Sequence, residues 1–106
     1  MSRVHELLQI TTASTADVEG DQFNLQMRQD ESGAIQYACT AGSCAEIELQ
    51  GRLDSSLGWM EIATSGAMDS SGTNNVVSTN VSMLPQMRAV LKTPTSGCVV
   101  WVYLME

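Results

Sequence analysis

Apolar and polar residues alternate with a period of two along most of the chain. Residues 22–28 show this pattern most clearly. Phe23, Leu25 and Met27 all fall on one side of this segment, and polar residues lie between them. Such alternation is typical of a β-strand that has one face in a core and the other in water. A chain dominated by this pattern is expected to fold into β-sheets.

Two further segments alternate in the same way. Ile47 and Leu49 are expected to share the inner face of a strand over residues 45–53. Further along the chain, Val77 and Val81 are expected to share one side of another strand.

The sequence predicts a single antiparallel β-sandwich, jelly-roll-like or Ig-like, or else a small barrel. Turn-forming residues separate some seven or eight short strands, as in segments 54–58 and 94–97, and no helical stripe of ten or more residues occurs. A chain of 106 residues has room for one core, so residues 1–106 are expected to form one domain.

The N-terminal segment gives a mixed signal. Val4, Leu7 and Leu8 have the spacing of a helical stripe. Leu8 and Ile10 instead fit a strand, and the β-branched run that begins at Ile10 favours the strand. Residues 1–12 are therefore expected to be a first strand or an N-terminal arm.

The charge balance argues against nucleic acid and membrane surfaces as partners. The net charge is −7, from 12 acidic and 5 basic residues, and the basic residues are scattered singly. Binding to phosphates or anionic lipids needs clustered Lys and Arg. The longest apolar run, Cys98–Met105, is far shorter than the ~20 residues of a membrane-spanning helix. No signal peptide is recognised at the start, so synthesis in a cytoplasm, such as that of a host cell, is expected.

The three cysteines are expected to be free thiols if the compartment is reducing. Cys39 and Cys44 flank four residues that read as a hairpin loop, whereas Cys98 lies far along the chain. Facing positions across a hairpin could be bridged, so a Cys39–Cys44 disulfide remains an alternative.

The sequence offers little for catalysis or metal binding. His5 is the only histidine, so a nucleophile–base pair would have to use it. Structural zinc sites usually pair ligands two to four residues apart, and Cys39, Cys44 and Cys98 do not fit that spacing well. We predict no catalytic, cofactor or metal site.

Two groups of acidic residues resemble parts of functional motifs, but neither is expected to bind calcium or to act in catalysis. The segment Asp17–Asp21 resembles part of a calcium loop, but Arg28 stands where an EF-hand needs a bidentate Glu. Glu46 and Glu48 share one strand face, and they are expected to keep that face wet rather than to act as a glycosidase pair.

The last apolar segment, Cys98–Met105, is the best candidate for an interface. It is apolar on both faces, so either a loop or a neighbouring subunit is expected to cover its second face. The long polar loop Thr64–Asn75 is a second candidate, since long loops in compact domains are often functional. The candidate interface residues are Val99, Trp101, Tyr103 and Met105 on the strand, and Met68, Asn74 and Asn75 in the loop.

From about residue 45 onward, the chain resembles small virion proteins of tailed bacteriophages. The segments that carry the resemblance are Ile47–Asp54, Gly58–Ile62, Met83–Ala89 and Thr95–Leu104. These match a strand that ends in a Gly-containing turn, a Trp on the return strand, a Pro-x-Met-Arg step and a final β-strand. Arg52 and Ser55-Ser56-Leu57 depart from the tighter turn of that pattern.

The resemblance implies a structural role in the virion. The expected function is that of a head decoration (cement) protein that binds the capsid exterior and bridges major capsid subunits. Its partners would be the major capsid protein, copies of itself, or both, in a homo-oligomer or a lattice on the virion. The alternatives are a tail or neck accessory protein and a carbohydrate-binding β-sandwich module. The carbohydrate alternative needs exposed aromatic residues, and most aromatic residues are expected to point inward.

Overall fold

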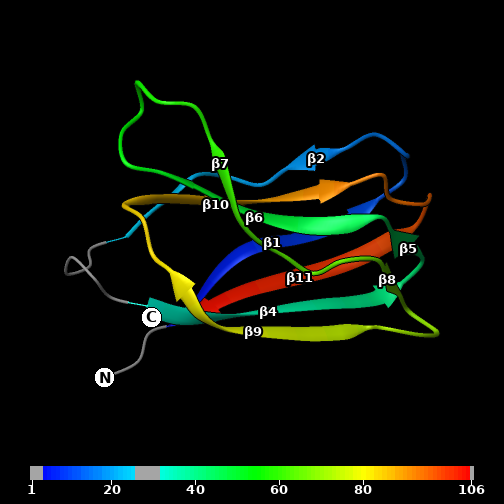
Figure 1. Cartoon of the computed structure of the whole chain (residues 1–106). Coiled ribbons are helices and arrows are strands. Elements are labelled where there is room, and N and C mark those ends of the chain that lie inside the picture. Colours follow the sequence, from blue (N-terminus) through cyan, green and yellow to red (C-terminus); the bar gives the residue numbers. More distant parts are fainter. Residues whose placement is uncertain (1–3, 26–31, 106) are drawn as a thin grey trace.

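The fold consists of two β-sheets packed face to face (Figure 1). The computed structural model describes residues 4–25 and 32–105. All strand pairs in these ranges are antiparallel. The prediction of an all-β sandwich is therefore confirmed. The described residues include no helix long and apolar enough to cross a membrane.

The first sheet, called sheet A, has four strands in the order β1-β11-β4-β9. Their bounds are Val4–Thr12 for β1, Cys98–Met105 for β11, Ser32–Ala41 for β4 and Asn75–Ser82 for β9. The strand that comes last in the chain thus lies inside the sheet, between the first strand and the fourth.

The second sheet, called sheet B, has β10 and β6 at its centre in the order β2-β10-β6-β7, and β3 also pairs with β10. The bounds are Val18–Glu19 for β2, Phe23–Asn24 for β3, Glu46–Arg52 for β6, Met60–Thr64 for β7 and Gln86–Lys92 for β10. A separate small ladder joins β5 (Ser43–Cys44) to β8 (Met68–Asp69).

The core lies between the inner faces of the two sheets. Alternate residues of the central strands are fully buried, as Ile47 and Leu49 illustrate on β6 and Val100 and Val102 on β11. Leu25 is also buried, as the alternation predicts, whereas Met27 lies outside the described residues.

Strand β1 contains a bulge that explains its mixed sequence signal. Glu6 pairs with Tyr103 and Leu8 pairs with Val102, so Leu7 is an extra residue between them. Both Leu7 and Leu8 are buried in the core. Two adjacent inward residues break the period-two pattern, although the backbone remains a strand.

A similar irregularity in β9 makes part of the sequence prediction wrong. Gly33 pairs with Val81 but Ile35 pairs with Ser78, so β9 carries an extra residue between these pairs. Asn80 in this stretch has a positive φ of 55°. The side chains change faces across the bulge, and Val77 is therefore 60% exposed while Val81 is buried.

The hairpin expected between Cys39 and Cys44 does not form. The chain turns at Gly42, which has a φ of 70°, and crosses from sheet A to sheet B. Strand β4 pairs with β11 and β9, whereas β6 pairs with β10 and β7. Cys39 and Cys44 thus do not face each other across a hairpin, and both are free and buried.

Candidate functional site

The outer face of sheet A is centred on β11. Val99, Trp101 and Tyr103 are half-buried there, and Met105 is 42% exposed. The alternate residues of the strand point into the core. The prediction that these four residues share one face is confirmed. In the isolated chain that face is partly open to solvent.

Two aromatic rings form the middle of this face. The rings of Trp101 and Tyr103 have centroids 6.2 Å apart and planes inclined by 26°. Gln9 of β1 pairs with Trp101, and Gln36 of β4 pairs with Tyr103. The amide of Gln36 donates to Oδ1 of Asn75 at 2.8 Å. The result is an aromatic platform bordered by amide groups.

The outer face of sheet A is almost uncharged. The outward residues are assigned from the strand register and the alternation of burial. Beside β11, the uncharged ones are Gln9, Thr11, Ala34, Gln36, Ala38, Thr40, Asn75, Val77 and Thr79. Glu6 is the one acidic or basic residue among the outward side chains that the structure describes. Burying most of this face would cost little in charge desolvation.

The outer face of sheet B has the opposite character, since its charges are numerous and several of them are paired. Arg88 donates to Gln50 at 2.8 Å and forms an ion pair with Glu19 at 3.1 Å. Lys92 lies 3.7 Å from a carboxylate oxygen of Glu48. A face whose charges already have partners gains little by exchanging them for those of another protein.

Trp59 lies on this charged face, in contact with two guanidinium groups. The guanidinium carbon of Arg52 is 4.1 Å from the centre of a Trp59 ring, and that of Arg88 is 4.5 Å away. Arg52 also donates to Gln86 at 2.7 Å. Cation–π contacts and hydrogen bonds together fix this aromatic residue in place.

The three carboxylates of Glu46, Glu48 and Glu61 meet on the same face, with oxygens within 4.8 Å of one another. Lys92 offsets part of this charge. The hydroxyl of Thr64 donates to Glu46 at 3.2 Å. Glu46 and Glu48 share the outward face of β6 as predicted, and their partners suit a solvated charged surface.

The acidic segment that resembles a calcium loop is engaged in pairing with β10. Asp17 accepts a hydrogen bond from the backbone N–H of Thr93 at 2.7 Å and lies 3.9 Å from Lys92. Glu19 holds Arg88. These acids attach a short edge strand to sheet B.

The loop Thr64–Asn75 is more ordered than the sequence suggests, because β8 lies within it. Met68 is only 1% exposed, so its place among the interface candidates is wrong. Met68 is therefore a core residue, and it anchors this polar loop to the body of the domain. Asn74 and Asn75 are exposed, and Asn75 stands at the border of the outer face of sheet A.

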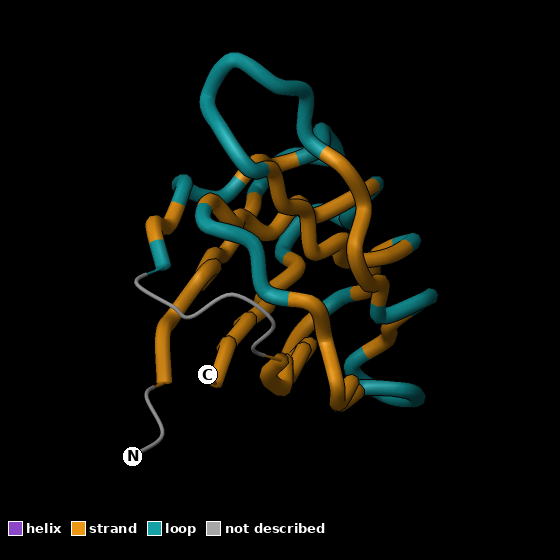
Figure 2. Tube along the Cα trace, turned by 60° about the vertical axis from the view of Figure 1, so that its left-hand side comes forward, coloured by secondary structure: helices purple, strands orange, loops and turns teal. Residues whose placement is uncertain are grey.

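A surface that the sequence reasoning missed is the β6–β7 loop, residues 53–59. It projects from the body of the sandwich in two views (Figures 1 and 2). Leu53 is 64% exposed, Leu57 49% and the adjoining Met60 61%. With Leu84 they line a hollow of about 340 Å³. The apolar Leu57 inside a segment read as a polar turn is the signal that could have revealed it.

The three thiols are sequestered in the core. The Sγ of Cys39 donates to the carbonyl of Ala41 at 3.3 Å. Burial raises the pKa of the Cys44 thiol to about 11 and that of Cys98 to about 12. Because the thiolate is the reactive form, these cysteines are expected to be inert in the folded chain.

We expect a thiol-specific disulfide reagent to label fewer than one cysteine per native chain at about pH 8, and all three after denaturation. Burial blocks access, and the raised pKa values of Cys44 and Cys98 keep these thiols protonated. The labelling rate in native buffer, followed by absorbance, checks this. Rapid labelling of all three thiols without denaturant would contradict it.

His5 lies in β1, and its side chain is not among those that the structure describes.

No protein-family model, curated protein or solved structure matches the chain.

Proposed function

We propose that this chain is a structural virion protein, a head decoration (cement) protein that binds the capsid exterior and bridges major capsid subunits. The observation that carries the proposal is the contrast between the two faces. The outer face of sheet A is almost uncharged with an apolar centre, whereas the outer face of sheet B carries many charges, several of them paired with one another. Such a molecule has one face suited to docking and one suited to water.

The side chains on the outer face of sheet A match the composition of interface centres. Aromatic residues and Met are enriched there, and the central strand offers Trp101, Tyr103 and Met105. Val77 adds a further exposed apolar side chain on the edge strand β9. The polar amides and hydroxyls around them would form the rim.

The size of this face favours attachment to an assembly of many copies. Four strands of about eight residues cover on the order of 500 Å². A stable one-to-one interface usually buries roughly 800 Å² on each partner. A single contact through this face would therefore be weak, and repetition over a capsid lattice would provide the strength.

Trp101→Ala is expected to reduce the number of copies bound to capsids stripped of the chain by at least tenfold. A central aromatic anchor is the kind of residue whose loss costs about 2 kcal/mol or more in binding. Quantitative mass spectrometry of sedimented particles measures the bound copies. Trp59→Ala is the matched control, because it removes the same side chain from the opposite face.

If both variants lost binding equally, or if neither lost binding, the proposal that the outer face of sheet A contacts the capsid would be contradicted. The unmodified chain is expected in hundreds of copies per virion. A count of a dozen or fewer would instead indicate a tail or neck position.

A carbohydrate-binding module is a second candidate, and one observation favours it. Of the five aromatic residues, Trp59, Trp101 and Tyr103 lie on outer faces, so the expectation that most point inward is wrong. Trp101 and Tyr103, with amides beside them, resemble a platform on which a sugar ring could stack. Binding of a glycan array that Trp101→Ala abolishes and Trp59→Ala preserves would favour this function.

A further inference from the structure

Strand β9 forms one edge of sheet A and has no strand beyond it (Figure 1). Its residues, Asn75–Ser82, include no charged residue and no proline, and its bulge begins only after Ser78. The free backbone groups of an edge strand can pair with another chain, so monomeric proteins usually protect such edges with charges, prolines or bulges. The first part of β9 has none of these three protections.

The β4–β9 ladder shows which backbone groups of β9 face the open edge. The N–H of Cys39 donates to the carbonyl of Asn74 at 2.9 Å, so every second residue from Asn74 onward turns its N–H and C=O towards β4. The residues between them, Asn75, Val77 and Thr79, present these groups to the open edge. Burial alternates regularly through Thr79, as expected of an extended strand. A short row of donors and acceptors is therefore available for another strand.

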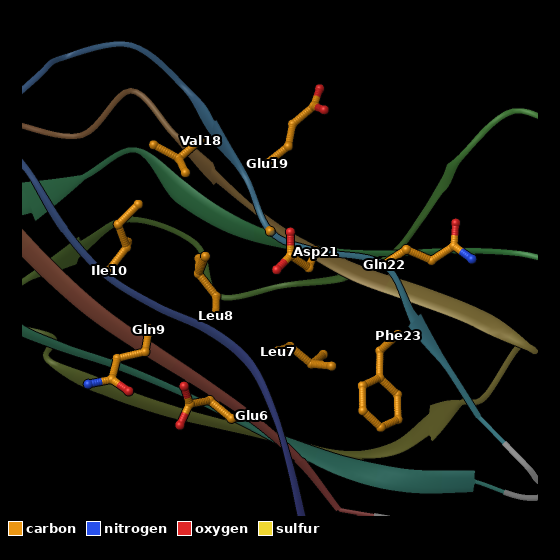
Figure 3. Close-up of a pocket in the computed structure, with 11 residues that line it drawn as sticks. Glu6, Leu7, Leu8, Gln9, Ile10, Val18, Glu19, Asp21, Gln22 and Phe23 are labelled. Carbon is orange, nitrogen blue, oxygen red and sulfur yellow. The ribbon is translucent and has the colours of Figure 1, made fainter.

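The opposite edge of sheet A, formed by β1, is protected. The bulge at Leu7 interrupts its backbone, and Glu6 is exposed on its outer face. Figure 3 shows the β2–β3 segment running beside β1. Gly20 of this segment packs so closely that a Cβ there would lie 2.9 Å from the carbonyl oxygen of Leu7. Sheet A thus has one edge open to pairing, and an assembly that uses this edge symmetrically closes at two copies.

We propose that β9 pairs with β9 of a second copy of this chain, antiparallel across a two-fold axis at Val77. In this register Val77 faces Val77 of the second copy, and Asn75 faces Thr79. All three edge-facing residues then exchange backbone hydrogen bonds. The two Val77 side chains, each 60% exposed in the isolated chain, come into contact with each other.

The charge pattern favours a second copy over a charged partner. Residues 74–82 offer no carboxylate to a basic segment and no cation to an acidic one, whereas an identical strand leaves no charge unpaired. Two copies with a net charge of −7 each repel one another, so they can associate only where the contact itself is uncharged. Glu6, the acidic residue on the outer face of sheet A, lies on β1 at the far edge of the sheet.

Pairing through β9 joins two four-stranded sheets into one continuous sheet. The outer faces of the two copies then form a single surface on the order of 1,000 Å². This exceeds the roughly 800 Å² that a stable interface buries on each partner. That the enlarged surface contacts a capsid rests on the proposed function, whereas the pairing of β9 does not.

Sedimentation over a range of concentrations tests the pairing. The paired segment is short, so a dissociation constant of roughly 10–100 µM is expected. The chain should have twice its mass of 11.4 kDa at about 0.5 mM and its single mass at about 1 µM. Val77→Lys places two like charges opposite each other and should weaken the dimer at least fivefold.

The matched control for Val77→Lys is Thr11→Lys, which adds the same charge at an exposed position of β1, the other edge strand. Circular dichroism checks that both variants fold. Trp101→Ala should leave the dimer intact, so failure of the pairing is distinguishable from failure of capsid attachment. A monomer at about 0.5 mM, or equal weakening by the two lysine variants, would overturn the proposal.

Mild oxidation of single-cysteine variants tests the register. Val77→Cys should form a covalent dimer, because only a residue on the two-fold axis faces its own copy within disulfide reach. Asn75→Cys should not, since Asn75 faces Thr79 of the second copy. The three native cysteines are buried and do not compete. Equally efficient cross-linking at positions 75 and 77 would contradict this register.

Discussion

Raising the pH from about 8 to about 11 is expected to remove several kcal/mol from the free energy of unfolding. Three buried acids, Tyr37, Cys44 and Cys98, are neutral in the folded chain. Burial raises the pKa of Tyr37 from 10.0 to about 12, and the Tyr37 hydroxyl has no hydrogen-bond partner among the described residues. The pKa of Cys44 rises from 9.0 to about 11, and that of Cys98 to about 12.

The sign follows from which state loses its protons first. In the unfolded chain these groups ionise near pH 9 to 10, while the folded chain still holds their protons. Deprotonation therefore favours unfolding, so their contribution is complete below about pH 8 and declines as the pH rises. The rise for Tyr37 alone corresponds to roughly 3 kcal/mol. Small domains have only about 5–15 kcal/mol in total.

Urea unfolding at a series of pH values measures this loss, and two tyrosine variants identify its source. Tyr37→Phe should flatten the decline above pH 10, because it removes one buried acid. Tyr103→Phe is the matched control, because it removes the same hydroxyl from a half-buried position on the surface. Constant stability up to pH 11 would show that these groups are not buried as described.

Leu49→Ala is expected to cost about 2–5 kcal/mol of unfolding free energy. Leu49 is fully buried on β6, opposite Ala89 of the central strand β10. Removing its side chain leaves a cavity between two well-packed sheets, and the neighbouring strands cannot close it without moving.

Leu53→Ala is the matched control for Leu49→Ala. The same side chain is removed four residues along, where it is 64% exposed, and a change within about 0.5 kcal/mol is expected. Chemical denaturation of the two variants in parallel gives both values. Similar costs at the two positions would mean that residues 53–59 are packed against the body in solution.

The alternation in the sequence predicted the strands well but did not predict how they pair. Ile47, Leu49 and Leu25 point inward because their faces follow from the period of two. The inward pair Leu7–Leu8 and the outward Val77 escaped prediction, since each depends on a bulge set by the partner strand. The crossover after Cys39 also lay beyond local patterns, because both sheets are built from pairs distant in sequence.

For the candidate surfaces, too, local sequence patterns predicted which residues share a face but not which residues are buried by distant parts of the chain. Trp101 and Tyr103 were predicted to share a face because they are two residues apart on one strand. Met68 looked exposed because its neighbours are polar, yet it is buried through its pairing with Cys44.

The position of β11 inside sheet A has a consequence for biosynthesis. This strand comes last in chain order, yet it separates β1 from β4 and pairs with both. Until β11 leaves the ribosome, β1 has no hydrogen-bonded partner strand in sheet A. The domain is therefore expected to fold late and as a unit, with slow, non-local closure and a need for protection from aggregation while translation continues.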